Sequence, residues 1–204
     1  MKPLVWRLSL APLLLASASV AAQTTAADDA LGGPEIPGVC LLSREAVFAN
    51  AEVGKSATAQ INALAEQSQS EINAERTSLE TELRSLEGQQ DPSRAQQLAE
   101  QRQSLARRWE TLQRLAAQRS REIEATRQKA VGRISAEAQP VVAAVYTRRG
   151  CGLLLDRGVV LGGNLGGDLT ADVVRGLDAK IKTISIQREV LPSEPAVGAG
   201  EPPR

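Results

Sequence analysis

The sequence of 204 residues contains no histidine and only four aromatic side chains: two tryptophans, one tyrosine and one phenylalanine. Histidine is the commonest proton shuttle and zinc ligand, so its absence excludes Ser-His-Asp triads and histidine-based zinc sites. Four aromatic residues argue against the large core of a bulky globular enzyme. Acidic residues are spread along helical patterns, and no pair is set apart for acid–base chemistry. We therefore expect no enzymatic activity, no metal and no cofactor.

Long apolar runs are also scarce, apart from one near the beginning of the chain, from Leu8 to Val20. The run follows two basic residues, is short for a membrane span and ends in small residues. This pattern predicts a secretory signal peptide over residues 1–22, cleaved near Ala22, and export to a bacterial periplasm. Residues 23–38 mix small, acidic and turn-forming residues without a period and are expected to form a flexible leader.

Neither sign of charge is in excess, because 24 lysine and arginine residues stand against 24 aspartate and glutamate residues. Loss of the signal peptide removes two basic residues, which leaves 22 against 24 and a net charge of −2. Such a balance gives no strong attraction to a polyanion. Nucleic acid is therefore not an expected partner.

Cysteine is rare, with Cys40 and Cys151 as the only two. Disulfides persist in an oxidising compartment, so a structural bridge and two separate buried thiols both fit. The spacing matches neither a redox C-x-x-C motif nor a metal-binding pattern. A structural role is favoured over redox chemistry.

The region from residue 55 to residue 87 has neither glycine nor proline. Within it Ile72, Leu79 and Leu86 stand seven residues apart, which is the spacing of a coiled-coil seam. A glycine and a proline then occur within residues 88–92, at positions typical of a helix end and a new helix start. The pattern predicts a long helix followed by a tight reversal.

After this reversal a second helical pattern, with apolar residues three and four apart, continues to Tyr146. The two segments predict an antiparallel helical hairpin over residues 55–146, with arms of roughly 50 Å at 1.5 Å per residue. Such an arm is too long to be buried by the rest of the chain. The predicted fold class is α+β, mostly α, with a coiled-coil hairpin projecting from a small β body. An ordinary rigid coiled-coil spacer fits the same periodicity.

Charge is divided unequally between the two arms of this hairpin. Residues 55–90 carry a net charge of −3, whereas residues 94–139 carry +5, so the arms should attract each other. The surplus arginines of the return arm, Arg107 and Arg108 among them, fit a solvated face with stems that cover apolar surface. A contact with acidic clients or anionic lipid headgroups is the functional alternative.

The residues on either side of the hairpin have β-strand character. Val39–Ser43 predicts a short buried strand, and Leu153–Leu155 and Val159–Leu161 predict a β-hairpin around a turn at residues 156–158. The glycine pairs that follow lack the spacing of a phosphate-binding loop, so no nucleotide site is expected.

A final helix is predicted to begin at Thr170 as its capping residue. The oligomerisation body would then comprise residues 39–54 and 147–186, and the proline-rich residues 187–204 would form a disordered tail. Three short strands make a body too small for a stable monomer, with unpaired edges that sister chains could close into a barrel. The residues expected in this oligomerisation body are Val39, Leu41, Leu153, Leu155, Val159 and Leu161.

The order of these motifs resembles the Skp (OmpH-like) family of periplasmic chaperones over residues 39–182. The resemblance is carried by Val39–Phe48, by Leu153–Asp156 and by the Asp-Leu-Thr-Ala-Asp-Val-Val run of Asp168–Val174, on either side of the charged hairpin. It implies a homotrimer with a central β-barrel and three helical arms that enclose a cavity. It also implies ATP-independent binding of unfolded outer-membrane proteins, which prevents their aggregation.

The resemblance further implies many weak contacts along the inner faces of the arms. The expected client-binding residues are Leu79, Leu83, Leu86, Leu98, Leu105 and Trp109. Contact with lipopolysaccharide or an anionic membrane surface would involve Arg107, Arg108, Arg119 and Arg121, although this near-neutral chain departs from the basic character of the family.

Two further hypotheses concern the cysteines and an alternative function. A bridge between Cys40 and Cys151 would tie the two ends of the hairpin together at the body. A structural coiled-coil protein of the envelope, or an adaptor whose hairpin docks onto a helical partner, is the alternative function. Such adaptors flank their hairpin with paired β domains, for which this chain has few strand residues.

Overall fold

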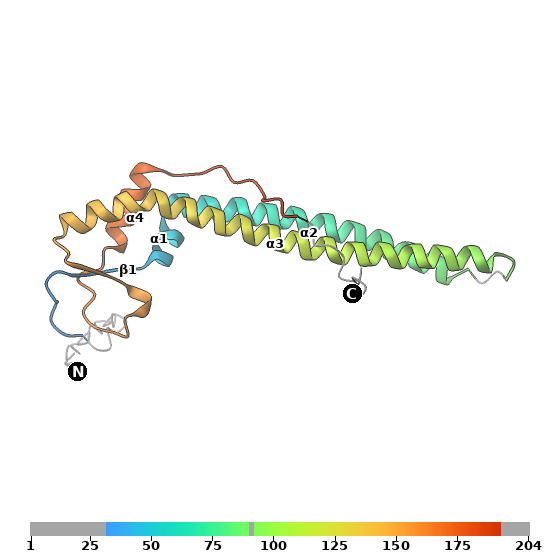
Figure 1. The fold of residues 1–204 in the computed structure, drawn as a ribbon, viewed down its shortest axis with the longest axis horizontal. Helices are drawn as coiled ribbons and strands as arrows, with labels where there is room; N and C mark the ends of the chain where they lie inside the picture. Colours follow the sequence, from blue (N-terminus) through green and yellow to red (C-terminus); the bar gives the residue numbers. More distant parts are fainter. Residues whose placement is uncertain (1–31, 90–91, 193–204) are drawn as a thin grey trace, which may run out of the picture.

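The structure is a computed structural model that describes residues 32–89 and 92–192. Its elements follow in the order β1, α1, α2, η1, α3, β2, η2 and α4, where η marks a 3₁₀ helix. Figure 1 shows an elongated molecule in which a two-helix arm projects from a small body at one end. The predicted signal peptide, residues 23–31 of the leader and residues 193–204 of the tail lie outside the described residues.

The arm consists of α2 (Glu52–Glu87) and α3 (Ala95–Arg148), which run antiparallel to each other (Figure 1). The helices have 36 and 54 residues, or about 54 and 81 Å at 1.5 Å per residue. Gly88 caps the end of α2, and η1 (Pro92–Arg94) precedes α3. The mostly helical fold with a small strand segment agrees with the predicted fold class. Among the described residues, no helix combines the length and apolar character needed to cross a membrane.

Six apolar side chains hold the outer part of the arm together. They are buried between the helices at intervals of seven residues on both, so the same face of each helix meets its partner at every second turn. Burial of each contributes about 2 kcal/mol to the stability of the arm. The six residues of this seam are Ile72, Leu79, Leu86, Leu98, Leu105 and Leu112.

The sheet of the body joins segments from the two sides of the arm. β1 (Val39–Leu42) and β2 (Leu153–Asp156) are parallel, with Val39 opposite Leu153 and Leu42 opposite Asp156. On the other edge of β1, the Leu41 nitrogen donates to the Gly167 carbonyl over 3.0 Å. β1 is therefore enclosed on both sides, and most of it is buried.

The β-hairpin predicted for residues 153–161 is not formed. The Asp156 carboxylate accepts a hydrogen bond of 2.9 Å from the Gly158 nitrogen, and the chain turns there into η2 (Arg157–Val159). An ion pair of 2.8 Å between Arg157 and Asp168 holds this turn. Residues 159–161 therefore leave the sheet, and β2 pairs with the distant β1 instead.

Two short helices complete the body. α1 (Arg44–Asn50) begins at Ser43, whose hydroxyl accepts a hydrogen bond of 3.1 Å from the Ala46 nitrogen. The predicted cap of α4 (Thr170–Lys180) is wrong, because Thr170 is the first helical residue and its nitrogen donates to the Asp168 carboxylate. The Thr170 hydroxyl instead accepts a hydrogen bond of 3.0 Å from the Ser43 nitrogen. This bond links the starts of the two helices.

The turn between α1 and α2 requires a glycine at residue 54. A Cβ atom built on Gly54 would lie 1.8 Å from the backbone oxygen of Phe48. We expect Gly54→Ala to lower the free energy of unfolding by about 2–3 kcal/mol, because the two helices must move apart to accept the methyl group. Urea unfolding followed by circular dichroism measures this change.

Gly132 on α3 provides the matched control, because a Cβ atom there meets nothing within 4 Å. Gly132→Ala should raise the free energy of unfolding by about 0.5–1 kcal/mol through helix propensity. Equal effects of the two substitutions would contradict the close packing assigned to Gly54.

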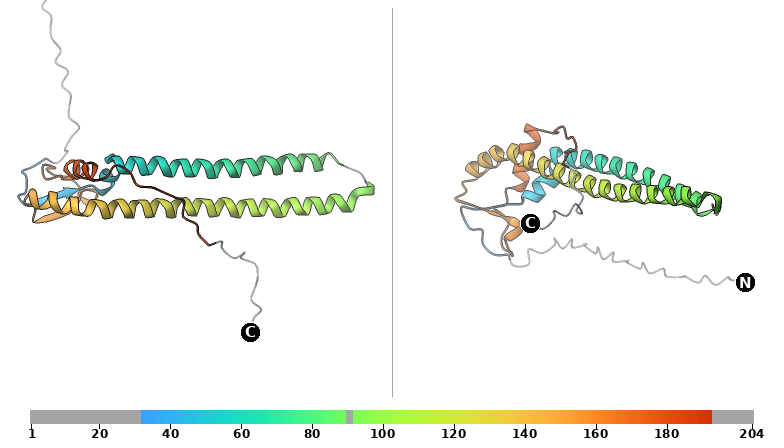
Figure 2. Two further views of the ribbon diagram at one scale, coloured as in Figure 1. Left: turned by 90° about the horizontal axis from the view of Figure 1, so that it is seen from above. Right: turned by 45° about the vertical axis from the view of Figure 1, so that its right-hand side comes forward.

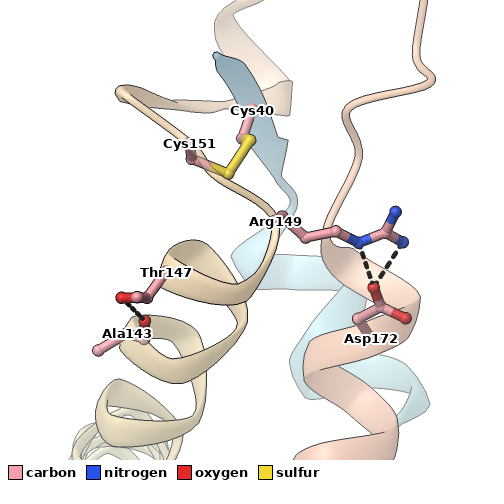
Figure 3. Close-up of a disulfide and its surroundings, with 6 residues drawn as sticks. All are labelled: Cys40, Ala143, Thr147, Arg149, Cys151 and Asp172. Atoms are coloured by element: carbon pink, nitrogen blue, oxygen red, sulfur yellow. Dashed lines mark hydrogen bonds and ion pairs between the residues drawn. A yellow bond between two sulfur atoms is a disulfide. The ribbon is translucent and has the colours of Figure 1, made fainter. Parts of the chain in front are cut away.

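A disulfide joins Cys40 of β1 to Cys151, which follows α3 (Figure 3). The two Cα atoms are 5.8 Å apart, and 111 residues separate the cysteines in the sequence. Close by, the Arg149 guanidinium binds the Asp172 carboxylate at 2.6 Å and so connects the end of α3 to α4. The bridge therefore lies where the two ends of the arm enter the body.

Residues 181–192, which we name the strap, follow α4 and lie along the arm in an extended conformation. Figure 2 shows the strap crossing from the body over the two arm helices. The prediction of disorder from residue 187 is wrong for residues 187–192, because the Glu189 nitrogen donates to the Thr126 hydroxyl at 2.9 Å and Lys129 pairs with Glu189 at 2.7 Å. The proline content of the tail predicts disorder, but polar side chains of α3 form hydrogen bonds with the backbone of residues 187–192.

Candidate functional site

A groove of about 1030 Å³ lies where the base of the arm meets the body. Its lining includes residues of α1, the short helix that Figure 1 shows beside the base of the arm. Val47 and Phe48 of α1 line it together with Val131 and Val142 of α3 and Val173 of α4. The α3 residues that line the groove recur every three or four positions, so they form one face of that helix. This face is separate from the leucine seam.

Polar side chains also line the groove. Arg44 and Asp156 form an ion pair of 3.0 Å there, and Lys55 stands on the α2 side. A hydrogen bond from the Gly158 nitrogen, followed by one from Arg44, lowers the pKa of Asp156 below its ordinary value. Within residues 32–89 and 92–192, no group of three cysteine or acidic side chains could hold a metal ion. The apolar lining suits the binding of apolar side chains.

The structure assigns most of the expected client-binding leucines to another role. Leu79, Leu86, Leu98 and Leu105 belong to the seam of the arm and are buried there. Their burial between α2 and α3 makes them unavailable to a client while the arm is folded, so their assignment as contact residues is corrected. Of the six expected residues, Leu83 is exposed and Trp109 is half-buried against the seam.

Two of the four arginines expected to contact an anionic surface are engaged within the arm. Arg108 of α3 reaches across to α2 and binds Glu75 at 2.9 Å and Glu82 at 2.7 Å. The hydrogen bonds that Arg108 donates to these carboxylates, to Glu82 first, raise the pKa of Arg108. The attraction predicted from the unequal charge of the arms therefore takes the form of a specific cross-arm bridge.

The other three arginines differ from one another. Arg119 pairs with Glu122 at 2.8 Å, Arg121 is half-buried, and Arg107 is exposed. The four arginines do not form a shared unpaired basic patch, because Arg108 and Arg119 are neutralised by neighbouring carboxylates.

A buried polar cluster in the middle of the arm was not foreseen from the sequence. Glu122 is completely buried and accepts hydrogen bonds from Arg119 at 2.8 Å and from Gln118 at 3.0 Å. Burial alone would raise the pKa of Glu122, but the bonds from Arg119 and then Gln118 lower it. Arg188 of the strap approaches the same carboxylate at 3.3 Å. The sequence carries one signal of this cluster, because Glu122 stands at an inward-facing position of α3 where an apolar residue would be expected.

The body displays an apolar edge that the residues described in the structure leave uncovered. Leu153 is 50% exposed, Val159 is 76% exposed and Leu161 is fully exposed. Leu155 is also exposed, whereas Val39 is half-buried and Leu41 is buried under the neighbouring segments. Exposed apolar side chains gathered on one small body indicate a surface for association. We name Leu153, Leu155, Val159 and Leu161 the apolar edge.

Comparison with known proteins places these features in a family context. A family model described as outer membrane protein (OmpH-like) matches residues 38–177. A crystal structure from Caulobacter crescentus CB15, described as a candidate outer membrane chaperone (OmpH-like), is 34% identical to this chain with a TM-score of 0.70. The alignment covers 78% of this chain and 94% of that one. The search of curated proteins gave no match. The strap lies beyond the last residue matched by the family model.

Proposed function

The chain belongs to the OmpH-like family, whose model covers more than half of its length, and we propose that it is an ATP-independent holdase chaperone of the periplasm. Its clients would be unfolded outer-membrane proteins, which it keeps from aggregating. The observation that carries this proposal is the combination of a long projecting arm with an apolar groove at the base of that arm. A holdase requires a sheltered apolar surface that binds an unfolded protein without catalysing a reaction.

Three copies of the chain would form the working unit. The apolar edge supports association, because four exposed apolar side chains on so small a body are costly in water. Within residues 32–89 and 92–192, no strand pairs with the second side of β2, and that side offers backbone groups to a neighbouring chain. Closure of three bodies into a barrel would bury both features and project three arms, with the grooves at their bases, around a common cavity.

The groove rather than the arm seam would supply the apolar contacts with a client. Phe48 and Val131 are the side chains we assign to this contact, because both line the groove and neither belongs to the seam. Many weak contacts across three grooves would hold a client firmly while each single contact is released easily. Lipopolysaccharide is not included in the proposal, because Arg108 and Arg119 are engaged in internal ion pairs.

The proposal is tested by diluting a urea-unfolded outer-membrane porin into buffer with one equivalent of the trimeric mature protein. We expect the porin to stay soluble in the absence of ATP, as measured by light scattering and by sedimentation. A protein that leaves the porin to aggregate, and that instead binds a helical partner through its arm, would favour the envelope adaptor.

The groove is tested with Val131→Asp, which places a charge on its lining at a position that is 39% exposed in the folded chain. We expect porin affinity to fall about tenfold, which corresponds to ~1.4 kcal/mol, while the helical circular dichroism signal is retained. Ala106→Asp, at an exposed position of α3 outside the groove, is the matched control and should leave affinity within about twofold. Equal losses in both variants would remove the groove from the proposal.

A further inference from the structure

We propose that the strap occupies a binding site for extended polypeptide on the arm, and that a segment of an unfolded client enters this site when the strap leaves. The inference rests on the proposed chaperone function and adds a second contact surface to it. The site lies across α2 and α3, on the side of the arm opposite α1 (Figures 1 and 2). Its occupant in the structure is the chain's own residues 181–192.

The arm binds the backbone of the strap as well as some of its side chains. The amide of Gln60 donates to the Ile184 carbonyl at 2.8 Å and accepts from the Ile186 nitrogen at 3.2 Å. A side-chain amide that satisfies a carbonyl and the nitrogen two residues later pairs with the strap as a neighbouring β-strand would. Every extended segment offers these two groups, so this contact does not depend on the sequence bound.

Further arm side chains continue this pattern along the strap. Arg133 donates to the Ser185 carbonyl at 2.8 Å, and the Thr126 hydroxyl accepts from the Glu189 nitrogen at 2.9 Å. Gln118 donates to the Leu191 carbonyl at 3.3 Å. The donors and acceptors thus follow an extended chain from Ile184 to Leu191 and lie on both helices of the arm.

Between residues 183 and 187, the side chains of the strap alternate between exposed and buried positions. Ile184 is buried and Ile186 is partly buried against the body core, whereas Thr183, Ser185 and Gln187 are exposed. Alternation of apolar and polar residues with a period of two is also the pattern of the strands of outer-membrane β-barrels. Residues 183–187 of the strap therefore share this alternation with the strands of such a barrel.

The buried polar cluster allows the strap to leave without stranding a charge. Glu122 keeps two partners on its own helix, Arg119 and Gln118, after Arg188 has gone. The contribution of Arg188 is also imperfect, because its Nε atom lies 3.3 Å from the carboxylate without a hydrogen bond to it. A buried carboxylate that retains its charge-assisted bonds does not oppose opening of the site.

The test uses three variants of the full mature chain. Ile184→Asp with Ile186→Asp should release the strap by placing charges in its apolar contacts, and Val190→Asp, at an 81% exposed strap position, is the matched control. Ser56→Cys with Thr183→Cys should lock the strap by a disulfide, since the two native hydroxyls are 2.8 Å apart. The probe is a fluorescent synthetic peptide of residues 181–192, read by anisotropy.

We expect the released variant, Ile184→Asp with Ile186→Asp, to bind the peptide about tenfold more tightly than the Val190→Asp control. This factor corresponds to a strap that covers the site in about nine tenths of the control molecules. A peptide carrying aspartate at both isoleucine positions should not bind. A urea-unfolded porin should displace the native peptide. The locked variant should bind porin several-fold more weakly when oxidised than when reduced, with unsubstituted protein under both conditions as the control.

Peptide binding that porin does not displace would overturn the inference and make the strap a private structural clamp. Equal porin affinity of the locked variant in its oxidised and reduced forms would overturn it as well, even if the released variant fails to fold. Neither result affects the proposed function, which stands or falls with the protection of porin by the unsubstituted protein.

Discussion

Replacing Cys40 and Cys151 by serine should lower the free energy of unfolding of the mature protein by about 4 kcal/mol. The bridge closes a loop across 111 residues, so its removal returns a large amount of conformational entropy to the unfolded chain. The neighbouring strands β1 and β2 have only four residues each and cannot replace it. Urea unfolding at a fixed protein concentration gives the difference, since assembly makes the stability depend on concentration.

Reduction of the unsubstituted protein is the matched control for this prediction. Reductant should produce the same loss of stability in the unsubstituted protein and should have no effect on the serine variant. Intact-mass analysis supplies the independent check, because neither thiol should react with an alkylating reagent before reduction. Full alkylation of both cysteines without reductant would contradict the bridge.

The long arm could be predicted from the sequence because its signals are local. Residues 55–87 lack glycine and proline, and Ile72, Leu79 and Leu86 recur at the heptad spacing, so helix and seam follow from one segment. The reversal at Gly88 is similarly local. The reversal predicted over residues 88–92 lies within a few residues of the observed end of α2 and the observed start of α3.

The arrangement of the body could not be predicted in the same way. β1 and β2 are parallel partners on either side of the whole arm, and the period of a strand does not identify its partner. Proximity along the chain therefore favours the nearest β-prone run, residues 159–161, as the partner of β2. The hydrogen bond between Gly158 and Asp156 that prevents this pairing becomes visible only in the folded chain.

Four of the six expected client-binding residues are buried for a related reason. The leucines with the clearest heptad spacing pack against each other in the seam of the arm. Their regular spacing therefore indicates helix packing and not contact with a client. The groove residues, such as Phe48 and Val131, come from separate helices, so no single stretch of the sequence displays the groove. Likewise, the role of Arg108 depends on Glu75 and Glu82, which lie on the opposite helix.

Placing charges on the apolar edge should separate the subunits and abolish chaperone activity together. The double variant Val159→Asp with Leu161→Asp replaces apolar side chains of each proposed interface by carboxylates. Association must then either bury these charges or give up the apolar contact. A cost of about 4 kcal/mol per interface weakens association about a thousandfold. We expect light scattering to give the mass of three chains for the unsubstituted protein and of one chain for the variant, which should no longer keep unfolded porin soluble.

Val190→Asp is the matched control, because it changes an equally exposed aliphatic residue that lies on the strap and not on the body. It should retain the mass of three chains and protect porin normally. Dilution of the protein tests whether protection of porin depends on assembly. We expect the trimer to dissociate before protection is lost, since a lone arm has no neighbours with which to enclose a client. A variant that keeps the mass of three chains would show that other residues join the bodies.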